Sequence, residues 1–464
     1  MQPWRQQPDH CPERIDQAGA VGGGHEYILT EPMEETRTSP GAATAAPRRR
    51  LIAIVVAAAL VAVSVPLALA GGELVAGNTP GPDPGWVFGV FGEGFVDRPM
   101  VYLCLLWLAI GLWIALLLLS GDLGFRRTAA VAALLIVLFV LAPPLLSLDV
   151  FSYISYARLG AEHGLNPYTH SPAELLPGDD AAIRVIDYRG AVSVYGPVFT
   201  LASYPLGLVA VPVALWSLKV VAGLAIAALA AIVARLAALR GVAPATAVAF
   251  VALNPIVLVH LVGGAHNDGL MAAIAMAAVA AALSARPATA GAGLVVAAAV
   301  KVSALLYAPF ALVGTRGLGA RGRLIAGGLA ALVAIGVVSL VVFGADVGEA
   351  LSVAGGNQGR VSRWSVPAAL SRASGLDVDL LRAVLGVGLA IALAWLIVAV
   401  ARGFDWVRAA GWAALAVLVA SAYIVPWYLI WLLPLAAVSR DRALIGATIV
   451  MTIFQAINGV PVTL

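Results

Sequence analysis

Apolar stretches of membrane length recur along this chain and restrict it to the folds that a bilayer allows. The stretch from Leu51 to Ala70 carries no charged residue, and about 20 such residues span the hydrocarbon core as an α-helix. Because 61% of the residues are hydrophobic and only 11% are charged, a soluble globular domain is excluded. The short alternating segments of a transmembrane barrel do not occur. We therefore predict an all-α integral membrane protein, a polytopic helical bundle.

The N-terminal residues 1–47 differ from the rest of the chain. They are rich in Pro, Gly, Gln, Glu and Thr without hydrophobic periodicity, which predicts a disordered tail. The triplet Arg48 to Arg50 directly precedes the first apolar stretch, and basic residues favour the cytoplasmic side. We expect a cytoplasmic N-terminus, with residues 48–464 forming a multi-pass domain in the plasma membrane.

Basic residues recur between the apolar stretches, and keeping them all cytoplasmic determines how the chain folds. The stretch Met100 to Leu119 then runs inward, Arg126 and Arg127 mark a turn, and Thr128 to Ser147 runs outward. Asp149 therefore emerges on the extracytoplasmic face. The later basic markers are Arg235, Arg240, Arg286, Arg316, Arg321, Arg323, Arg402, Arg408, Arg440 and Arg442.

Three stretches are too short for two full spans and predict short re-entrant helix pairs. In the first, Tyr195 to Leu208 dips into the membrane and back before Leu218 to Ala234 crosses inward. The second, between Arg286 and Arg316, turns at Lys301, and the third, 409–438, turns near 425–428. Non-helical backbone at this depth needs protein or water around it. We expect about 11 to 13 membrane segments in total.

Residues 148–195 interrupt the apolar pattern with acidic, aromatic and proline-containing sequence. If Asp149 begins a short helix on the membrane surface, then Asp149, Tyr153 and Tyr156 share one face of it. A carboxylate beside two tyrosines can form a sugar-binding wall. The alternative is that Asp149 caps the helix and that the tyrosines anchor it at the interface.

The only two lysines among the 28 basic residues, Lys219 and Lys301, both lie in apolar sequence. Charge inside a membrane is expensive and usually functional. Each lysine either extends to the headgroups as an anchor or receives a lipid phosphate.

A second polar cluster, 263–269, contains His266, Asn267 and Asp268 and lies between an outward and an inward segment, on the same face as Asp149. These side chains can hydrogen-bond sugar hydroxyls or orient a base, while helix capping is the alternative. A zinc site is not predicted, because His or Cys partners are missing nearby in the sequence.

Two aromatic segments have structural and functional interpretations. The segment 355–364 lies outside in this topology, where its Gly, Arg and Trp content is typical of a mobile loop over an acceptor glycan. Arg363 can pair with phosphate, and Trp364 can stack on a sugar or anchor at the interface. For the segment 426–428, helix breaking and an aromatic belt are a sufficient explanation.

Three clusters occur in a fixed order: Asp-Val-x-x-Tyr at 149–153, Gly-x-Asn-Pro-Tyr at 164–168 and Tyr-Gly-Pro at 195–197. In this order they resemble the GT-C glycosyltransferases, multispanning enzymes that use lipid-phosphate sugars. The resemblance is closest to the polyprenol-phosphate-mannose-dependent α-(1→6)-mannosyltransferases, which build bacterial lipomannan-type glycans of the cell envelope. It covers about Leu148 to Leu432.

The resemblance implies an inverting transferase that moves mannose from polyprenyl phosphate mannose to a growing α-(1→6)-mannan, or to a phosphatidylinositol-mannoside-like acceptor, outside the cytoplasm. It implies that Asp149 is the general base on the acceptor hydroxyl. The departing phosphate needs cationic or hydrogen-bonding partners. The predicted substrate-binding residues are Tyr153, Tyr156, Asn166, Tyr168, Tyr195, His266, Asn267, Asp268, Lys301, Lys219 and Arg363.

No cofactor, nucleotide sugar or nucleic acid is expected as a ligand, since the sequence has no Gly-rich phosphate loop or Rossmann fingerprint. Residue 150 is Val, so no Asp-Asp or Asp-x-Asp pair occurs there to hold a divalent metal. Asp179 and Asp180 are interpreted as solvated surface charges. Two alternatives stay open: a GT-C transferase of another lipid-linked sugar, and a non-catalytic transporter or flippase of such a lipid.

Overall fold

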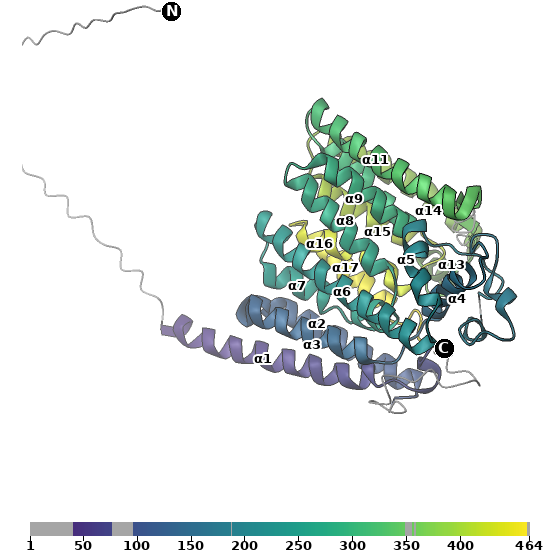
Figure 1. Ribbon diagram of the computed structural model, residues 1–464. Coiled ribbons are helices and arrows are strands. Elements are labelled where there is room, and N and C mark those ends of the chain that lie inside the picture. The colour runs from purple at the N-terminus through teal and green to yellow at the C-terminus, as the bar shows by residue number, and fades with distance from the viewer. Residues whose placement is uncertain (1–39, 77–95, 187, 349–354, 357–358, 462–464) are drawn as a thin grey trace, which may run out of the picture. The chain divides into compact units, whose positions relative to one another are not determined.

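The computed structural model describes residues 40–76, 96–186, 188–348, 355–356 and 359–461 (Figure 1). Most of the predicted disordered tail, residues 1–39, lies outside the described residues. Helix α1 (Pro40–Ala68) begins before residue 47, so the last part of the predicted tail is helical. Residues 46–464 form one compact unit, which is described below by itself.

The described residues form helices and two isolated β-bridges, without a β-strand. The α-helices are α1 (Pro40–Ala68), α2 (Pro99–Leu123), α3 (Phe125–Leu141), α4 (Asp149–Ala161), α5 (Pro197–Gly207), α6 (Val211–Leu239), α7 (Pro244–Ala252), α8 (Asp268–Leu283), α9 (Pro287–Val300), α10 (Ala308–Gly314), α11 (Leu318–Phe343), α13 (Val366–Ser374), α14 (Val378–Ala401), α15 (Trp406–Ala420), α16 (Leu433–Val438) and α17 (Arg442–Gln455). Single turns and the short elements η5 (Val257–Gly263), η6 (Val302–Tyr307) and η8 (Pro426–Trp431) connect them. The predicted all-α class is confirmed.

Five of the described helices are long and apolar enough to cross a membrane. They are Pro47–Ala68, Pro99–Leu123, Val211–Leu239, Leu318–Gly348 and Val378–Ala401. Shorter apolar helices, α8, α9 and α15 among them, lie between these in the bundle (Figure 1). The prediction of a polytopic helical membrane protein is therefore confirmed.

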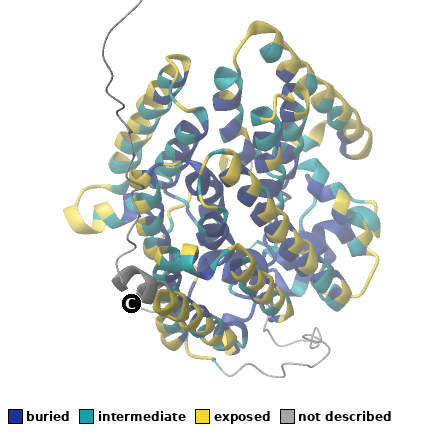
Figure 2. Ribbon diagram, turned by 90° about the vertical axis from the view of Figure 1, so that its left-hand side faces the viewer, coloured by how far each residue is buried: buried dark blue, intermediate teal, exposed yellow. Residues whose placement is uncertain are grey.

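The helices pack in layers, with α3 on α6, α6 on α8, α8 on α9 and α9 on α11. Figure 2 shows the buried residues at the centre of these layers and the exposed residues at the periphery. The apolar windows of α11 and α14 are only 6% and 11% buried, against 56% for α6. Helices α11 and α14 therefore present their apolar side chains outward, as lipid-facing helices do.

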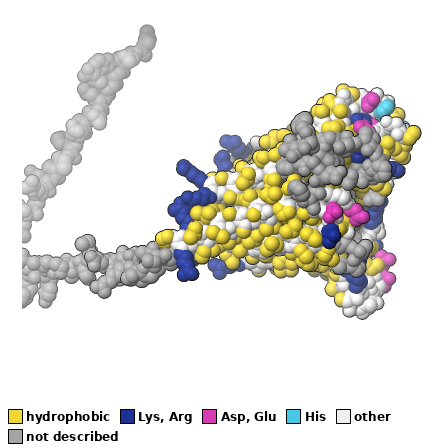
Figure 3. Space-filling view, turned by 90° about the horizontal axis from the view of Figure 1, so that it is seen from below, with side chains coloured by type: hydrophobic (Ala, Val, Ile, Leu, Met, Phe, Trp, Pro, Cys, Tyr) yellow, Lys and Arg dark blue, Asp and Glu magenta, His cyan; other side chains and the backbone are white. Residues whose placement is uncertain are grey.

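Charged side chains lie mainly at the two ends of the apolar body. In Figure 3, one end shows Lys and Arg alone, and the other end shows Asp, Glu and His together with further Lys and Arg. Three ion pairs join helix ends: Arg49 with Asp122 at 3.3 Å, Arg240 with Asp405 at 2.9 Å and Arg408 with Asp441 at 2.5 Å.

Two of the three predicted short helix pairs are present. Helix α9 ends at Val300 and is followed at once by η6 and α10, with Lys301 between them. After α15, the elements η8 and α16 return from a turn at 421–425. The first predicted pair is wrong, because Tyr195 to Leu208 holds the single helix α5 rather than an in-and-back turn. The crossing helix that follows, α6, is continuous from Val211 rather than starting at Leu218. Pro212 lies in the first turn of α6, where its missing N–H is no loss.

A bend that the sequence analysis missed leads to the polar cluster at 263–269. Helix α7 and the π-helix η5 meet at 62°. Pro255 at the bend has no N–H to continue the helix, and the side chain of Asn254 accepts a hydrogen bond from the N–H of Ile256 at 2.9 Å. The segment predicted as one outward span is therefore broken.

Helices α4 and α5 approach each other closely through glycines. A Cβ atom at Gly207 would lie 2.6 Å from the backbone carbonyl carbon of Ala157, and one at Gly160 would overlap the Tyr204 ring. Small residues permit such contact between helix backbones. This contact packs α4, the helix that begins at Asp149, against α5.

Candidate functional site

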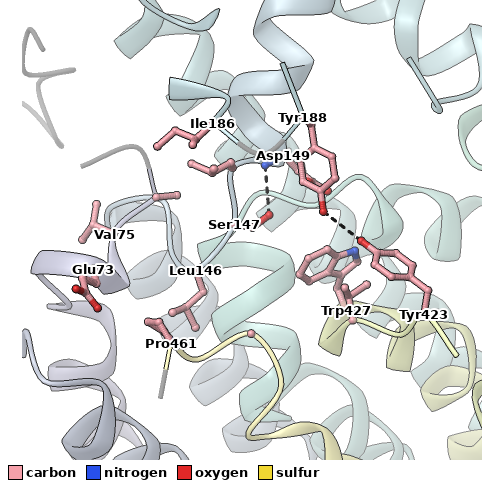
Figure 4. A pocket seen from close by; sticks show the side chains of 14 residues that line it. Glu73, Val75, Leu146, Ser147, Asp149, Ile186, Tyr188, Tyr423, Trp427 and Pro461 are labelled. Atoms are coloured by element: carbon pink, nitrogen blue, oxygen red, sulfur yellow. Dashed lines mark hydrogen bonds between the residues drawn. The ribbon is translucent and has the colours of Figure 1, made fainter. Parts of the chain in front are cut away.

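The Asp149 side chain does not cap the helix that it begins. Leu148 is the N-cap of α4 and makes no side-chain capping bond. The N–H of Asp149 donates to Ser147 Oγ at 3.3 Å (Figure 4). The carboxylate reaches across to another element instead, with Oδ2 lying 3.3 Å from Nδ1 of His266. The capping alternative for Asp149 is thus not what the structure shows.

His266 lies in the turn between η5 and α8, where it is 1% exposed. Its ring stacks on Trp427 of η8, with the ring centroids 3.7 Å apart and the planes at 19°. The backbone N–H of His266 donates to the carbonyl of Leu261 at 3.1 Å. Since both ring and backbone are held, Nδ1 stays directed at Asp149.

The charge state of Asp149 follows from its surroundings. Burial raises the pKa of this carboxyl, but the neighbouring His266, the positive charge of Lys301 and hydrogen bonding from Tyr195 outweigh burial and hold the pKa below its usual value. Asp149 is therefore ionised at neutral pH and able to accept a proton.

Lys301 and Asp268 form a buried ion pair. Lys301 Nζ lies 2.5 Å from Asp268 Oδ2, and the other carboxylate oxygen accepts a hydrogen bond from Trp431 Nε1 at 3.0 Å. The Lys301 ammonium also lies 5.1 Å from the centroid of the Tyr428 ring. Asp268 is fully buried, whereas the Lys301 side chain keeps 14% of its surface exposed.

Two cavities meet at Asp149. The large cavity, of about 420 Å³, and the small cavity, of about 80 Å³, share four lining residues: Asp149, Tyr188, Tyr423 and Trp427. The large cavity is further lined by Glu73, Val75, Ala76, Leu146, Ser147, Leu148, Ile186, Val425, Gly459 and Pro461 (Figure 4). The small cavity is further lined by Ser152, Tyr156, Ala191, Val192, Val194, Tyr195, Lys301 and Tyr428. An ionised carboxylate thus stands where both cavities are within reach.

The predicted tyrosines divide between the cavity wall and the layer behind it. Tyr156 and Tyr195 line the small cavity, and the hydroxyl of Tyr156 donates to the carbonyl of Ala191 at 2.8 Å. Tyr153 lies behind them, with its ring edge-on to Tyr195 at 4.7 Å and its hydroxyl accepting from the N–H of Asn267 at 3.4 Å. The buried side-chain amide of Asn267 has no hydrogen-bond partner among the described residues.

Asn166 and Tyr168 line neither cavity. The side chain of Asn166 donates to the carbonyl of Phe343 at 2.7 Å and accepts from the N–H of Tyr168 at 3.1 Å. The buried hydroxyl of Tyr168 donates to the carbonyl of Tyr195 at 2.9 Å. Both residues connect the 164–168 segment to the end of α11 and to the start of α5, which is a structural task.

Lys219 is fully buried and also lines neither cavity. Its ammonium donates to the carbonyl of Gly263 at 2.7 Å, with the carbonyls of Pro143 and Val262 at 3.4 and 3.5 Å. It therefore neither extends to the headgroups nor faces the site where Lys301 lies. The structure does not bring Lys219 to a position where it meets a substrate phosphate.

The segment beyond residue 359 reaches the site through a different arginine from the one predicted. The guanidinium of Arg360 lies 5.3 Å from the centroid of the Tyr188 ring, and Tyr188 lines both cavities, although Arg360 itself lines neither. Arg363 instead lies over the ring of Trp364 at 5.4 Å, and its carbonyl accepts a hydrogen bond from Arg372. Arg363 lines neither cavity.

Asp179 and Asp180 are paired with the protein. Both lie within 2.6 Å of the guanidinium of Arg158, and the Asp179 side chain is only 9% exposed. The interpretation of Asp179 as a solvated surface charge is wrong, because α4 supplies a cation for it.

The cavity residues that the sequence analysis missed include Glu73, Tyr188, Tyr423 and Trp427. Trp427 was explained by helix breaking and an aromatic belt, yet it stacks on His266. Tyr188 and Tyr423 hydrogen-bond each other through their hydroxyls at 3.3 Å (Figure 4). Within the described part of the chain, no group of three His, Cys, Asp or Glu residues is placed to hold a metal ion. Metal-independence stays a prediction.

Comparison with known proteins shows the family to which this chain is related. A family model described as "Alpha-(1->6)-mannopyranosyltransferase, N-terminal domain" matches residues 59–316. This range includes Asp149, His266, Asp268 and Lys301, but ends before Trp427. No solved structure matches the chain.

Individual relatives share the same printed activity. Alpha-(1->6)-mannopyranosyltransferase A of Corynebacterium glutamicum is 27% identical over 194 residues, 41% of this chain and 39% of that protein. The protein of the same name in Mycobacterium tuberculosis is 30% identical over 234 residues, 47% of this chain and 43% of that protein. A Mycolicibacterium smegmatis protein named "Probable alpha-(1->6)-mannopyranosyltransferase" is 26% identical over 416 residues, 77% of this chain and 73% of that protein. The matches thus span about two fifths of the length of the first two relatives.

Proposed function

Since the chain belongs to the alpha-(1->6)-mannopyranosyltransferase family, we propose that it is an inverting mannosyltransferase. It takes mannose from polyprenyl phosphate mannose and adds it to a growing α-(1→6)-mannan of a lipoglycan. The observation that carries this proposal is the position of Asp149, an ionised carboxylate between a large open cavity and a small one that holds a lysine ammonium.

The proposed reaction is a single displacement. The acceptor hydroxyl, bound in the large cavity, attacks the anomeric carbon while the bond from that carbon to the phosphate oxygen breaks on the opposite face. The hydroxyl proton passes to the Asp149 carboxylate, and the bonding electron pair leaves with the polyprenyl phosphate. A carboxylate held by His266 within reach of the acceptor is suited to this general-base role.

Lys301 is the proposed partner of the departing phosphate. Its ammonium lines the small cavity and is held by Asp268, so it is oriented before any substrate binds. Ligand cavities usually measure about 300–1,000 Å³, so the small cavity, at about 80 Å³, is too small for the whole mannosyl phosphate. We therefore place only the donor phosphate beside Lys301, with the mannosyl group extending towards Asp149 and the large cavity.

The proposed orientation follows from the end of the apolar body at which Figure 3 shows Lys and Arg alone. Basic residues favour the cytoplasmic side, which would place the N-terminus in the cytoplasm and both cavities on the outside of the plasma membrane. A lipid-linked donor is the form in which an activated sugar reaches that side, where the mannan or phosphatidylinositol-mannoside-like acceptor would be extended.

The test is transfer by the purified full-length chain from radiolabelled polyprenyl phosphate mannose to a short mannoside. Replacing Asp149 by Asn should lower the rate by about 10²- to 10⁴-fold. Glu162→Gln is the matched control, because it removes an exposed carboxylate at the other end of α4 and should leave the rate unchanged. Transfer that survives Asp149→Asn intact would remove the base assignment, and linkage analysis of the product tests the α-(1→6) bond.

The same preparation decides between the proposal and its rivals. If the wild-type chain transfers no sugar from any polyprenyl phosphate but moves the lipid across vesicles, it is a transporter and the enzyme proposal fails. If another lipid-linked sugar is transferred and mannose is not, the chemistry stands and the donor is corrected.

A further inference from the structure

A third cavity, of about 590 Å³, lies among helix ends that carry arginines. The turn between α8 and α9, the end of α10, the start of α11, the end of α14 and the start of α15 surround it. None of its lining residues lines the two cavities at Asp149. We refer to it as the arginine cavity.

The arginine cavity is cationic. Arg316, Arg321 and Arg323 line it, and Asp405 is its one acidic lining residue. The carboxylate of Asp405 is already engaged, since it pairs with Arg240 at 2.9 Å and accepts from the N–H of Arg408 at 2.7 Å. With three arginines and one aspartate among its lining residues, the cavity keeps a net positive charge.

Two of the three arginines are available to a ligand. Arg321 donates to the carbonyls of Thr315 and Val313 at 2.8 and 3.0 Å, which holds the turn between α10 and α11. Arg316 and Arg323 are exposed and have no ion-pair or hydrogen-bond partner among the described residues. A guanidinium group matches a phosphate in geometry and charge, with two parallel hydrogen bonds.

The rest of the cavity and its surroundings are apolar. Val313, Phe404 and Trp406 contribute to the wall. The helices α11 and α14, which begin and end at the cavity, are the two long helices with the least buried apolar windows, and Leu318 at the start of α11 is 85% exposed. A ligand here meets arginines at one end and outward-facing apolar helices at the other.

We propose that the arginine cavity binds the phosphodiester headgroup of an anionic phospholipid, whose acyl chains lie along α11 and α14. The volume is in the range of ligand cavities, and basic cavities between membrane helices are suited to anionic headgroups. A soluble anion would use the arginines but not the apolar helices. This site is separate from the proposed transfer chemistry and stands whether or not that proposal holds.

The test is native mass spectrometry of the purified full-length chain released from detergent with phosphatidylglycerol or phosphatidylcholine. The double substitution Arg316→Gln with Arg323→Gln should weaken phosphatidylglycerol binding by about thirtyfold, because each arginine near an anionic headgroup contributes about a factor of five. Phosphatidylcholine binding should not change. The matched control is Arg126→Gln with Arg127→Gln, two exposed arginines at the start of α3 that do not line the cavity, and it should bind both lipids as the wild type does.

Two further measurements complete the test. Replacing Arg316 and Arg323 by Lys keeps the charge and should retain most of the preference for the anionic lipid. The proposal is overturned if the Gln pair binds phosphatidylglycerol as tightly as the wild type, or if the control pair weakens it equally. It is also overturned if inorganic phosphate at the same concentration displaces the lipid, since the site would then be one for free anions.

Discussion

The ion pair between Lys301 and Asp268 allows stability and activity to be separated. At 2.5 Å, the two charges attract each other by roughly 6–7 kcal/mol at an effective dielectric constant of about 20. Desolvation offsets part of this attraction, and breaking a buried pair by removing one partner typically costs about 3–5 kcal/mol. Asp268→Asn should destabilise the protein by that amount, because the Lys301 ammonium would be left without its counter-charge.

The double variant Asp268→Asn with Lys301→Met leaves no uncompensated charge. Its cost should fall below the sum of the two single costs by about 0.5–3 kcal/mol, the coupling expected of residues in direct contact. Thermal unfolding of the four proteins in one detergent measures this coupling. Single costs that simply add would refute the argument that the two charges stabilise each other in the folded protein.

Transfer activity then separates two roles of Lys301. If its ammonium receives the donor phosphate, the double variant should regain stability yet transfer mannose only at a much reduced rate, because the cation is gone. If transfer recovers together with stability, Lys301 serves only as a counter-ion for Asp268, and the phosphate role is refuted. Measuring both quantities on the same preparation excludes loss of folded protein as the explanation.

Three further outcomes are expected. His266→Gln should move the acid limb of the pH–rate profile to higher pH, because burial would still raise the pKa of Asp149 while the opposing effect of His266 is gone; an unchanged limb would contradict this. Gly207→Ala should cost about 1–3 kcal/mol and lower the melting temperature through backbone overlap, whereas Gly121→Ala, which has no atom within 4 Å, should not; equal effects would argue against the close helix contact. Arg360→Gln should raise KM up to about fivefold, because it removes the cation–π contact that holds Tyr188 in the wall of both cavities, and an unchanged KM for both substrates would contradict this.

Topology explains why part of the site could be predicted from the sequence. The basic markers put the residues around 149, 266 and 301 on one face, and the structure brings Asp149 within 3.3 Å of His266 and lets Lys301 lower the Asp149 pKa. The length of an apolar segment and the placement of charges beside it are properties of single segments, so both can be read directly from the sequence. Which segments then touch depends on helix packing, as with Trp427 on His266, and no local pattern records it.

Lys219 shows the limit of reasoning from charge in apolar sequence. A buried ammonium can extend to headgroups, receive a substrate or satisfy carbonyls that a helix has left free. Lys219 does the last of these, since it donates to the carbonyl of Gly263 at the end of η5. Predicting this contact would have required the bend between α7 and η5, which the sequence analysis missed. The sequence shows the lysine but not that carbonyl, so the alternatives could not be separated.

The lowered pKa of Asp149 raises a question about its strength as a base, which the position of Lys301 answers. A carboxylate with a depressed pKa is a weaker proton acceptor, and part of the depression comes from the charge of Lys301. When an anionic donor phosphate binds beside that ammonium, it offsets the charge and the pKa of Asp149 should rise. Donor binding would thus strengthen the base only when there is a sugar to transfer.

This coupling has a kinetic signature. The pH dependence of kcat/KM reports the free enzyme, and that of kcat reports the enzyme with substrate bound. The acid limb of kcat should therefore lie at higher pH than the acid limb of kcat/KM for the donor. In Lys301→Met, the acid limbs of kcat and kcat/KM should lie at the same pH, because no lysine charge is left for the phosphate to offset. Coincident limbs in the wild-type enzyme would show that the phosphate binds away from Lys301.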